Sequence, residues 1–436
     1  MSRIRIIITI IVVVLTTLLT GCTGKEPNEI AYVVALGIDS TDDDNYKITI
    51  QYANTTQISG GASESGGKAG SEIVDNVTIE APNIYAGVGL ANNIVSKSFS
   101  MSHAKLIVFS KEIAEKGVKD MIETLVRSEE IRPDVFIAVA NTTANDYLTS
   151  VNPEMEVNPA QYYQLIYQKN QLVGIPDGQL REFFTGLYTD NYDSILPVAG
   201  VIDGSGGNSQ NEGSEGSLES LDSFESKSSN ENDKEKDAEK NTSKYEYDIK
   251  NYVGGETAIE KKNKAEAIGA AVFEKDKMVG ELGEVETEIC KILKGDYTYS
   301  YLTYYNNDTP DIPITVKTTQ QKKPKYKIDT DKKTVDIELY IESDLYSLPS
   351  DYNVENKIEE FERDVANYTS SACTEFINNF TKKYNSDILK LNEKVKYKFL
   401  TNNQYNWFKK NVGWSEYKFS VCTNFKVRRT GLIVRE

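Results

Sequence analysis

Residues 203–244 cannot form a hydrophobic core, and they divide this 436-residue chain into two parts. They consist mostly of Ser, Gly, Asn, Glu, Asp and Lys, and their only large apolar residues are Leu218, Leu221 and Phe224. A segment of this composition buries too little apolar surface to offset the entropy lost on folding. We therefore predict a disordered polar linker at 203–244, with folded structure on both sides of it.

Residues 1–21 have the features of a bacterial signal peptide. Arg3 and Arg5 precede an apolar run at 6–19, which is shorter than the ~20 residues that a membrane-spanning helix needs. Residues 19–22 read Leu-Thr-Gly-Cys and match a lipobox, in which the cysteine sulfur receives a diacylglyceryl group. We predict that Cys22 is the lipidated first residue of the mature chain and that 22–29 form a tether. The alternative is an ordinary signal anchor with a chance cysteine.

The chain is strongly acidic, with a formal net charge of −17 at pH 7. Without Arg3 and Arg5 the mature protein is close to −19. Such a charge disfavours binding to nucleic acid and to anionic lipid. We therefore expect membrane attachment through the acyl chains on Cys22 and through protein partners, because two or more chains make a stable anchor.

Patterns for catalysis and metal binding are missing from the sequence. His103 is the only histidine, so a Ser-His-Asp triad, a Cys-His pair or a multi-histidine site would have to use it or do without one. The cysteines after Cys22 form no CxxC pair, although a disulfide between Cys373 and Cys422 is possible. Residues 87–92 begin like a dinucleotide-binding fingerprint but lack its third glycine, so close helix packing explains them better. We predict no catalytic residue, no cofactor and no metal.

The first folded part, residues 30–202, alternates helices and strands, which predicts an α/β layer with a crossover connection. Ser110 is suited to cap a helical stretch whose buried face carries Ile113, Val118, Ile122 and Val126. The other predicted elements are a hairpin at 30–39 and 46–52, helices at 82–96, 161–167 and 180–187, and strands at 105–109, 135–140 and 194–202.

The second part has the pattern of an α+β fold, in which a mostly antiparallel sheet is covered by one long helix. We divide it into a middle domain at 245–305 and a C-terminal domain at 306–436, so the whole is a three-domain lipoprotein of mixed α/β and α+β class. The predicted elements are a hairpin at 267–273 and 277–282, a helix at 286–293, strands at 312–316, 325–328, 334–341 and 417–428, and a long helix carrying Ile358, Phe361, Val365, Ala372, Phe376 and Phe380.

Taken in order, several segments resemble the C-subunit lipoproteins of spore germinant receptors, the GerAC-type family. Each segment alone is a weak signal, but their order and spacing along the mature chain are specific. The segments are 31–39, Ala81, 102–118, Arg127 with 130–133, 270–282, 387–389, Trp407 and a final strand that ends at Gly431.

The resemblance implies a lipoprotein on the outer face of the spore inner membrane. It would assemble with an A subunit and a transporter-like B subunit into a complex that senses nutrients and triggers germination. The family's C subunit has no known enzymatic activity, and the resemblance assigns no ligand-binding residue. The segment from His103 to Lys105 matches a family motif, and we expect a packing role at a strand entry for it, with contact to a ligand as the alternative. The alternative function is a solute-binding lipoprotein of an importer, which would need a ligand cleft between two lobes.

Overall fold

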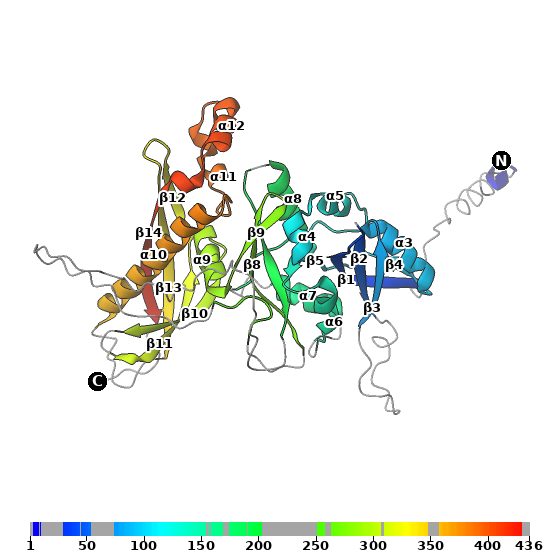
Figure 1. Ribbon diagram of the computed structural model, residues 1–436, viewed down its shortest axis with the longest axis horizontal. Helices are drawn as coiled ribbons and strands as arrows, with labels where there is room; N and C mark the ends of the chain where they lie inside the picture. Colours follow the sequence, from blue (N-terminus) through cyan, green and yellow to red (C-terminus); the bar gives the residue numbers. More distant parts are fainter. Residues whose placement is uncertain are drawn as a thin grey trace, which may run out of the picture. The chain divides into compact units, whose positions relative to one another are not determined.

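The computed structural model describes residues 3–7, 9, 29–43, 45–53, 74–153, 156, 158–168, 174–189, 191–202, 251–257, 263–306, 309–347 and 357–429. The chain forms two compact units, coloured from blue to red along the sequence in Figure 1. The first unit comprises Met1–Gln168 and Gly178–Thr185, and the second comprises Lys169–Asp177 and Gly186–Glu436. Cys22 and the predicted linker at 203–244 lie outside the described residues, and the three predicted domain boundaries stay predictions.

The first unit is built on a mixed sheet with the strand order β3-β2-β1-β5-β6. The predicted hairpin is confirmed, because β1 and β2 pair antiparallel with Ile38 opposite Ile48. The predicted strands at 105–109 and 135–140 are confirmed as β5 and β6, which lie parallel to β1 and to each other. The strands are β1 (Ile30–Ser40), β2 (Tyr46–Ala53), β3 (Val74–Ala81), β4 (Ser98–Ser100, parallel to β1), β5 (Leu106–Ser110) and β6 (Phe136–Ala140).

Helices follow the strands of this unit, and every residue of β5 and β6 is buried. Parallel strands covered on both faces have such continuous apolar sequences. The predicted helices at 82–96 and 161–167 are confirmed as α3 and α7, whereas α6 was not predicted. The helices are α3 (Ile84–Ile94), α4 (Lys111–Lys116), α5 (Lys119–Val126), α6 (Ala144–Ser150) and α7 (Pro159–Gln168), followed by α8 (Leu180–Thr189).

The helical stretch after Ser110 differs from its prediction. Ser110 Oγ accepts a hydrogen bond from the backbone N–H of Ile113, as expected of a cap. However, Gly117 has a φ of 124° and ends α4, so the stretch is two helices. The break changes the phase of α5, which buries Ile122 and Leu125 but leaves Val126 39% exposed. The prediction that Val126 faces the core was therefore wrong.

The second unit contains an antiparallel group, β7-β8-β9, and a five-stranded sheet in which β10-β11-β13-β12 is joined by β14 on β13. The predicted hairpin is confirmed as β8 and β9, with Lys275 at a φ of 58° in its turn. The elements are β7 (Ile195–Val201), β8 (Ala265–Glu274), β9 (Lys277–Leu282), α9 (Glu284–Lys294), β10 (Tyr299–Asn306), β11 (Thr309–Gln320), β12 (Lys325–Asp329), β13 (Thr334–Ser347), α10 (Ile358–Lys383), α11 (Leu391–Val395), the 3₁₀ helix η3 (Lys396–Lys398), α12 (Asn402–Asn411), the 3₁₀ helix η4 (Trp414–Glu416) and β14 (Lys418–Arg429).

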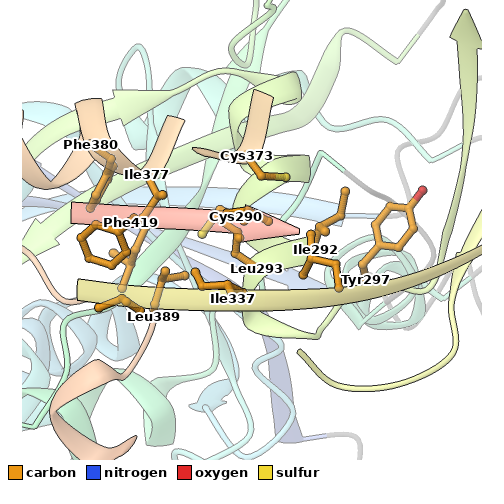
Figure 2. Close-up of a cluster of buried hydrophobic side chains, with 14 of the residues drawn as sticks. Cys290, Ile292, Leu293, Tyr297, Ile337, Cys373, Ile377, Phe380, Leu389 and Phe419 are labelled. Atoms are coloured by element: carbon orange, nitrogen blue, oxygen red, sulfur yellow. The ribbon is translucent and has the colours of Figure 1, made fainter. Parts of the chain in front are cut away.

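The long helix α10 covers one face of the five-stranded sheet, as predicted (Figure 1). Figure 2 shows Ile377 and Phe380 of this helix beside Phe419 of β14 in the buried cluster. The sheet is not wholly antiparallel, because β14 runs parallel to β13. The chain leaves β13, crosses the sheet through α10 and re-enters as β14, and such a crossover permits a parallel pair.

The possible disulfide between Cys373 and Cys422 does not exist in this structure, where both residues carry free thiols. Cys373 on α10 is 1% exposed, and its side chain lies in the core between this helix and the sheet (Figure 2). The neighbours of Cys422 on β14, Val421 and Thr423, are buried, and Val421 belongs to the same hydrophobic cluster as Cys373. Successive side chains of a strand alternate between its faces, so Cys422 points away from Cys373 and is exposed.

Candidate functional site

A hollow of about 570 Å³ opens on the surface of the first unit, between α3, β4 and the end of α5. Its lining combines apolar side chains with hydrogen-bonding and charged groups, as ligand and partner sites do. The lining residues are Tyr85, Val88, Asn92, Phe99, Met101, Thr124, Arg127, Ser128, Glu129 and Glu130.

The wall formed by α3 is fixed by close packing and by two asparagines. A Cβ at Gly87 would lie 2.6 Å from Ile48 Cδ1, so this glycine lets α3 approach β2. Asn83 caps the helix by accepting a hydrogen bond from Ala86 N–H at 2.9 Å. Asn92 Oδ1 accepts a hydrogen bond from Phe99 N–H at 2.7 Å, which holds the turn between α3 and β4. The interpretation of residues 87–92 as a packing segment is thereby supported.

The opposite wall is a turn that follows α5. Ser128 Oγ accepts hydrogen bonds from Glu130 N–H and Ile131 N–H at 3.2 and 3.3 Å. The Glu130 carboxylate then accepts one from Met101 N–H at 2.6 Å and so ties the turn to the end of β4. Arg127 pairs with Glu123 at 3.3 Å, but its side chain remains 81% exposed at the rim.

The hollow therefore presents a rim of mixed charge, with Arg127 beside Glu129 and Glu130, together with the Tyr85 ring and an apolar floor. Burial raises the pKa of Tyr85 above its ordinary value, while its hydrogen bond with Ser128 acts in the opposite direction. The phenol of Tyr85 is thus protonated at neutral pH and available as a donor or an acceptor. Together with Arg127 and the carboxylates of the rim it can hold a polar group of a ligand or of a partner protein.

The segment from His103 to Lys105 is adjacent and has a structural role. Lys105 N–H donates to Val34 O at 2.9 Å, and Lys105 O accepts from Phe136 N–H at 3.0 Å, so this residue joins β1 to β6. The exposed His103 ring meets Tyr32 edge-on, with ring centroids 4.7 Å apart. These contacts support the predicted packing role at a strand entry. His103 does not line the hollow.

Several ionisable groups with perturbed pKa values lie inside the second unit instead. Burial raises the pKa of Glu288 to about 7 and lowers that of Lys291 to about 8. The Lys291 ammonium donates to Ile175 O at 3.1 Å. Burial also raises the pKa of Asp387 to about 7, although its carboxylate accepts hydrogen bonds from Leu391 N–H and Asn392 N–H at the start of α11. Asp387 thus takes part in holding α11.

The sequence assigned one site residue, Cys22, and it lies outside the described residues, so its lipidation stays a prediction. In the part of the chain that the structure describes, no helix is both long and apolar enough to cross a membrane. No cluster of three or more metal-ligating side chains occurs among those residues either. Sequence reasoning did not assign the hollow. The signal that could have found it is that Arg127 and Glu130 both belong to segments that carry the family resemblance.

Comparison with known proteins gives matches over both units. The pattern described as "Spore germination protein N-terminal domain" matches residues 24–201, and "Spore germination B3/ GerAC like, C-terminal" matches residues 268–431.

Three similar proteins are spore germination proteins of Bacillus. "Spore germination protein KC" of Bacillus subtilis (strain 168) is 26% identical over 176 residues, which cover 37% of this chain and 43% of that protein. "Spore germination protein B3" of the same strain is 26% identical over 148 residues, covering 32% and 36%. "Spore germination protein GerQC" of Bacillus cereus is 27% identical over 104 residues, covering 24% and 29%. The matched stretch thus spans less than half of each relative.

A solved structure, "Crystal Structure of the GerBC protein", is 15% identical to this chain. It covers 90% of this chain and 96% of its own, with a TM-score of 0.49.

Proposed function

Because the chain belongs to the GerAC-type family of spore germination proteins, we propose that it is the C subunit of a nutrient germinant receptor. The observation that carries this proposal is the match of both family patterns, in order, at residues 24–201 and 268–431. The gap between the two matches contains the predicted linker at 203–244, so an inserted polar segment does not disturb either matched part.

In this proposal the subunit acts outside the cytoplasm, on the outer face of the spore inner membrane. Cys22 carries the lipid, and the mature chain assembles with membrane-embedded A and B subunits. The role is non-catalytic: the subunit supports assembly of the receptor or transmission of its signal. Anchoring all subunits in one membrane raises their effective concentration, so modest contacts are sufficient for assembly.

We further propose that the nutrient binds to a partner subunit. A small polar nutrient needs a concave site with several convergent polar groups. The hollow of the first unit is open, and several of its polar groups already accept hydrogen bonds from the backbone: Asn92 from Phe99 N–H, Ser128 from Glu130 N–H and Ile131 N–H, and Glu130 from Met101 N–H. Calorimetry of the unlipidated chain with amino acids and sugars should give no saturable heat. Saturable binding at micromolar nutrient would contradict this part and favour the importer alternative.

Germination of spores tests the function directly. Deleting the gene should abolish or strongly slow the response to at least one nutrient, and a wild-type copy should restore it. Release of dipicolinic acid measures the response, and a non-nutrient trigger serves as the control for spore integrity. If null spores answered every nutrient at the wild-type rate, and in every background lacking other receptors, the proposal would be wrong.

The role of the lipid is tested by Cys22→Ala. The variant should incorporate no labelled fatty acid, be held by the inner membrane more weakly than the wild type and restore germination poorly. The matched control is Cys422→Ala, because Cys422 is an exposed thiol on β14 that the proposal gives no part in anchoring. Labelling that persists in Cys22→Ala and disappears in Cys422→Ala would overturn the assignment of the lipid site.

A further inference from the structure

The segment at residues 390–411, which we name the basic tip, has a charge opposite to that of the rest of the chain. It contains six lysines and one glutamate, for a net charge of +5, whereas the whole chain has −17. The tip comprises α11, η3 and α12. Figure 1 shows α12 projecting beyond the end of α10 in the second unit.

The tip also exposes large hydrophobic side chains. Leu400 is 94% exposed and Tyr397 is 78% exposed, which makes them the two most exposed large hydrophobic residues among those described. Trp407 on α12 is 63% exposed. Tyr397 and Leu400 line a shallow hollow of about 420 Å³ together with Lys396. Apolar surface concentrated in this way is typical of a site that meets a partner or a membrane.

These side chains are exposed although other rings of the tip pack into the hydrophobic core of the second unit. Phe399, Tyr405, Phe408 and Trp414 form a chain of ring contacts with centroids 5.0 to 5.9 Å apart. Thr401 Oγ1 caps α12 by accepting a hydrogen bond from Gln404 N–H. The rings of the tip are thus divided between a buried set that holds its shape and an exposed set that does not contribute to the core.

The lysines of the tip are also divided between two roles. Lys394 donates to Leu389 O at 2.7 Å, and Lys409 donates to Asn191 Oδ1 at 3.1 Å, so these two hold the tip to the second unit. Lys398 likewise donates to the backbone oxygen of Ile328 in β12. Lys396 and Lys410 are exposed, and no ion pair joins either of them to a carboxylate within the described residues. Their charge therefore acts outward.

We propose that the basic tip binds the surface of an anionic lipid bilayer. Leu400, Tyr397 and Trp407 enter the headgroup region, and the exposed lysines face lipid phosphates. Lysine combined with Trp, Tyr and Leu is the composition of segments that lie in a membrane interface. A protein interface is the less suitable occupant, because lysine is depleted there. The tip adds a second attachment to the lipid on Cys22, and the proposal does not depend on the receptor function.

Vesicle binding tests this proposal. The mature chain with Cys22→Ala, which cannot be lipidated, is mixed with vesicles of phosphatidylglycerol and phosphatidylcholine or of phosphatidylcholine alone. We expect co-sedimentation with the anionic vesicles only, weakened by salt because surface charges are screened. A blue shift of tryptophan fluorescence should accompany binding and disappear in Trp407→Phe.

Variants of the tip separate its two contributions. Lys396→Glu with Lys410→Glu should weaken partitioning at least ~10-fold, since each lysine near an anionic surface contributes roughly fivefold. Leu400→Ser with Trp407→Ser should weaken partitioning onto the anionic vesicles at both low and high salt. The matched controls are Lys119→Glu with Lys277→Glu and Ile94→Ser, which alter equally exposed positions elsewhere. An unfolding midpoint temperature equal to that of the wild type confirms that each variant is folded.

Binding of the tip variants at wild-type strength would overturn the proposal, as would equal binding to neutral vesicles. A wild-type chain that binds neither kind of vesicle would also overturn it and would make the tip a docking surface for a protein.

Discussion

The two units bury their sheets in different ways. Every residue of β5 and β6 in the first unit is buried, whereas β14 in the second unit alternates between buried and exposed positions from Lys418 to Lys426. The strands β5 and β6 are therefore inner strands covered on both faces. The sheet that contains β14 has one face under α10 and one face in water.

The open face of the second sheet carries a network of polar contacts. Ser420 Oγ donates to Asp336 at 2.7 Å, and Asn424 donates to Glu338 at 3.1 Å. Arg428 pairs with Glu342 at 3.2 Å, with half of its side chain exposed. The second unit can therefore accept new polar or charged side chains on the open face of its sheet and on the basic tip without unfolding, whereas the buried strands β5 and β6 of the first unit cannot.

Lysine substitutions at two neighbouring positions of β5 and of β14 should give the largest difference in the free energy of unfolding. Both Ile107→Lys and Val108→Lys on β5 place a charge at a fully buried site, and each should cost on the order of 5 kcal/mol or unfold the unit. On β14, Val421→Lys should be severe, but Cys422→Lys should stay within about 0.5 kcal/mol, because Cys422 is exposed opposite Glu338. Urea unfolding measures all four variants. Tolerance of either β5 variant would contradict the two-face burial of that strand.

Two buried carboxylates, one in each unit, should differ in how strongly they make the stability of the protein depend on pH. Asp387 in the second unit has its pKa raised by burial from 3.8 to about 7, so the unfolded chain loses this proton first as pH rises. Its contribution to stability therefore falls between about pH 4 and pH 7, by at most about 1.4 kcal/mol per pH unit. Asp387→Asn should remove this slope.

The matched carboxylate in the first unit is Asp39, which accepts hydrogen bonds from Ala144 N–H and Asn145 N–H. Burial raises its pKa as well, and these backbone donors oppose the shift. The shift is smaller than that of Asp387, so Asp39→Asn should change the slope less than Asp387→Asn does. Unfolding free energies at several pH values between 4 and 7 give both slopes, and parallel curves for wild type and Asp387→Asn would refute the assignment.

Two glycines of α3 test how closely a helix covers the first sheet. Gly87→Ala forces Ile48 Cδ1 to move, and we expect a loss of about 1 kcal/mol. Gly89 has nothing within 4 Å of an added Cβ, so Gly89→Ala should gain about 0.5–1 kcal/mol from helix propensity alone. Thermal or urea unfolding compares the two variants, and equal gains would show that α3 does not pack tightly on β2.

The smallest effect is expected on the open face of the second sheet. Arg428→Ala removes the pair with Glu342, whose side chain is 35% exposed, and should cost less than about 1 kcal/mol. This loss of stability should be smaller still in high salt, because salt screens exposed charges. A loss several times larger, unaffected by salt, would mean that this face is covered by other structure.

Local patterns in the sequence predicted the elements that depend on local chemistry. The alternation of Val335, Ile337, Leu339 and Ile341 correctly gave a strand with one buried face. The spacing from Phe361 to Phe380 correctly gave α10. The cap at Ser110 was also found, because a cap needs only its own side chain and a nearby N–H group.

Elements that depend on distant partners were not predicted. β3 and β10 have mixed sequences, and each becomes a strand by pairing with a neighbour, β2 or β11. The parallel pairing of β13 with β14 and the opposite orientations of Cys373 and Cys422 likewise follow from the path of α10 across the sheet. The hollow of the first unit brings Tyr85 together with Arg127 from separate helices, which no spacing in the sequence reveals. Net charge averages over the chain, so −17 concealed the local excess of lysine at the basic tip.

Isolation of the complex from spore inner membranes tests the central claim, that this chain is a receptor subunit, most directly. An affinity tag placed within residues 203–244 should leave both matched family regions intact, because a polar linker tolerates insertion. We predict that the tagged chain is recovered with an A subunit and a polytopic B subunit in comparable amounts. Recovery of the chain alone, or with a permease and an ATPase, would contradict the receptor assignment.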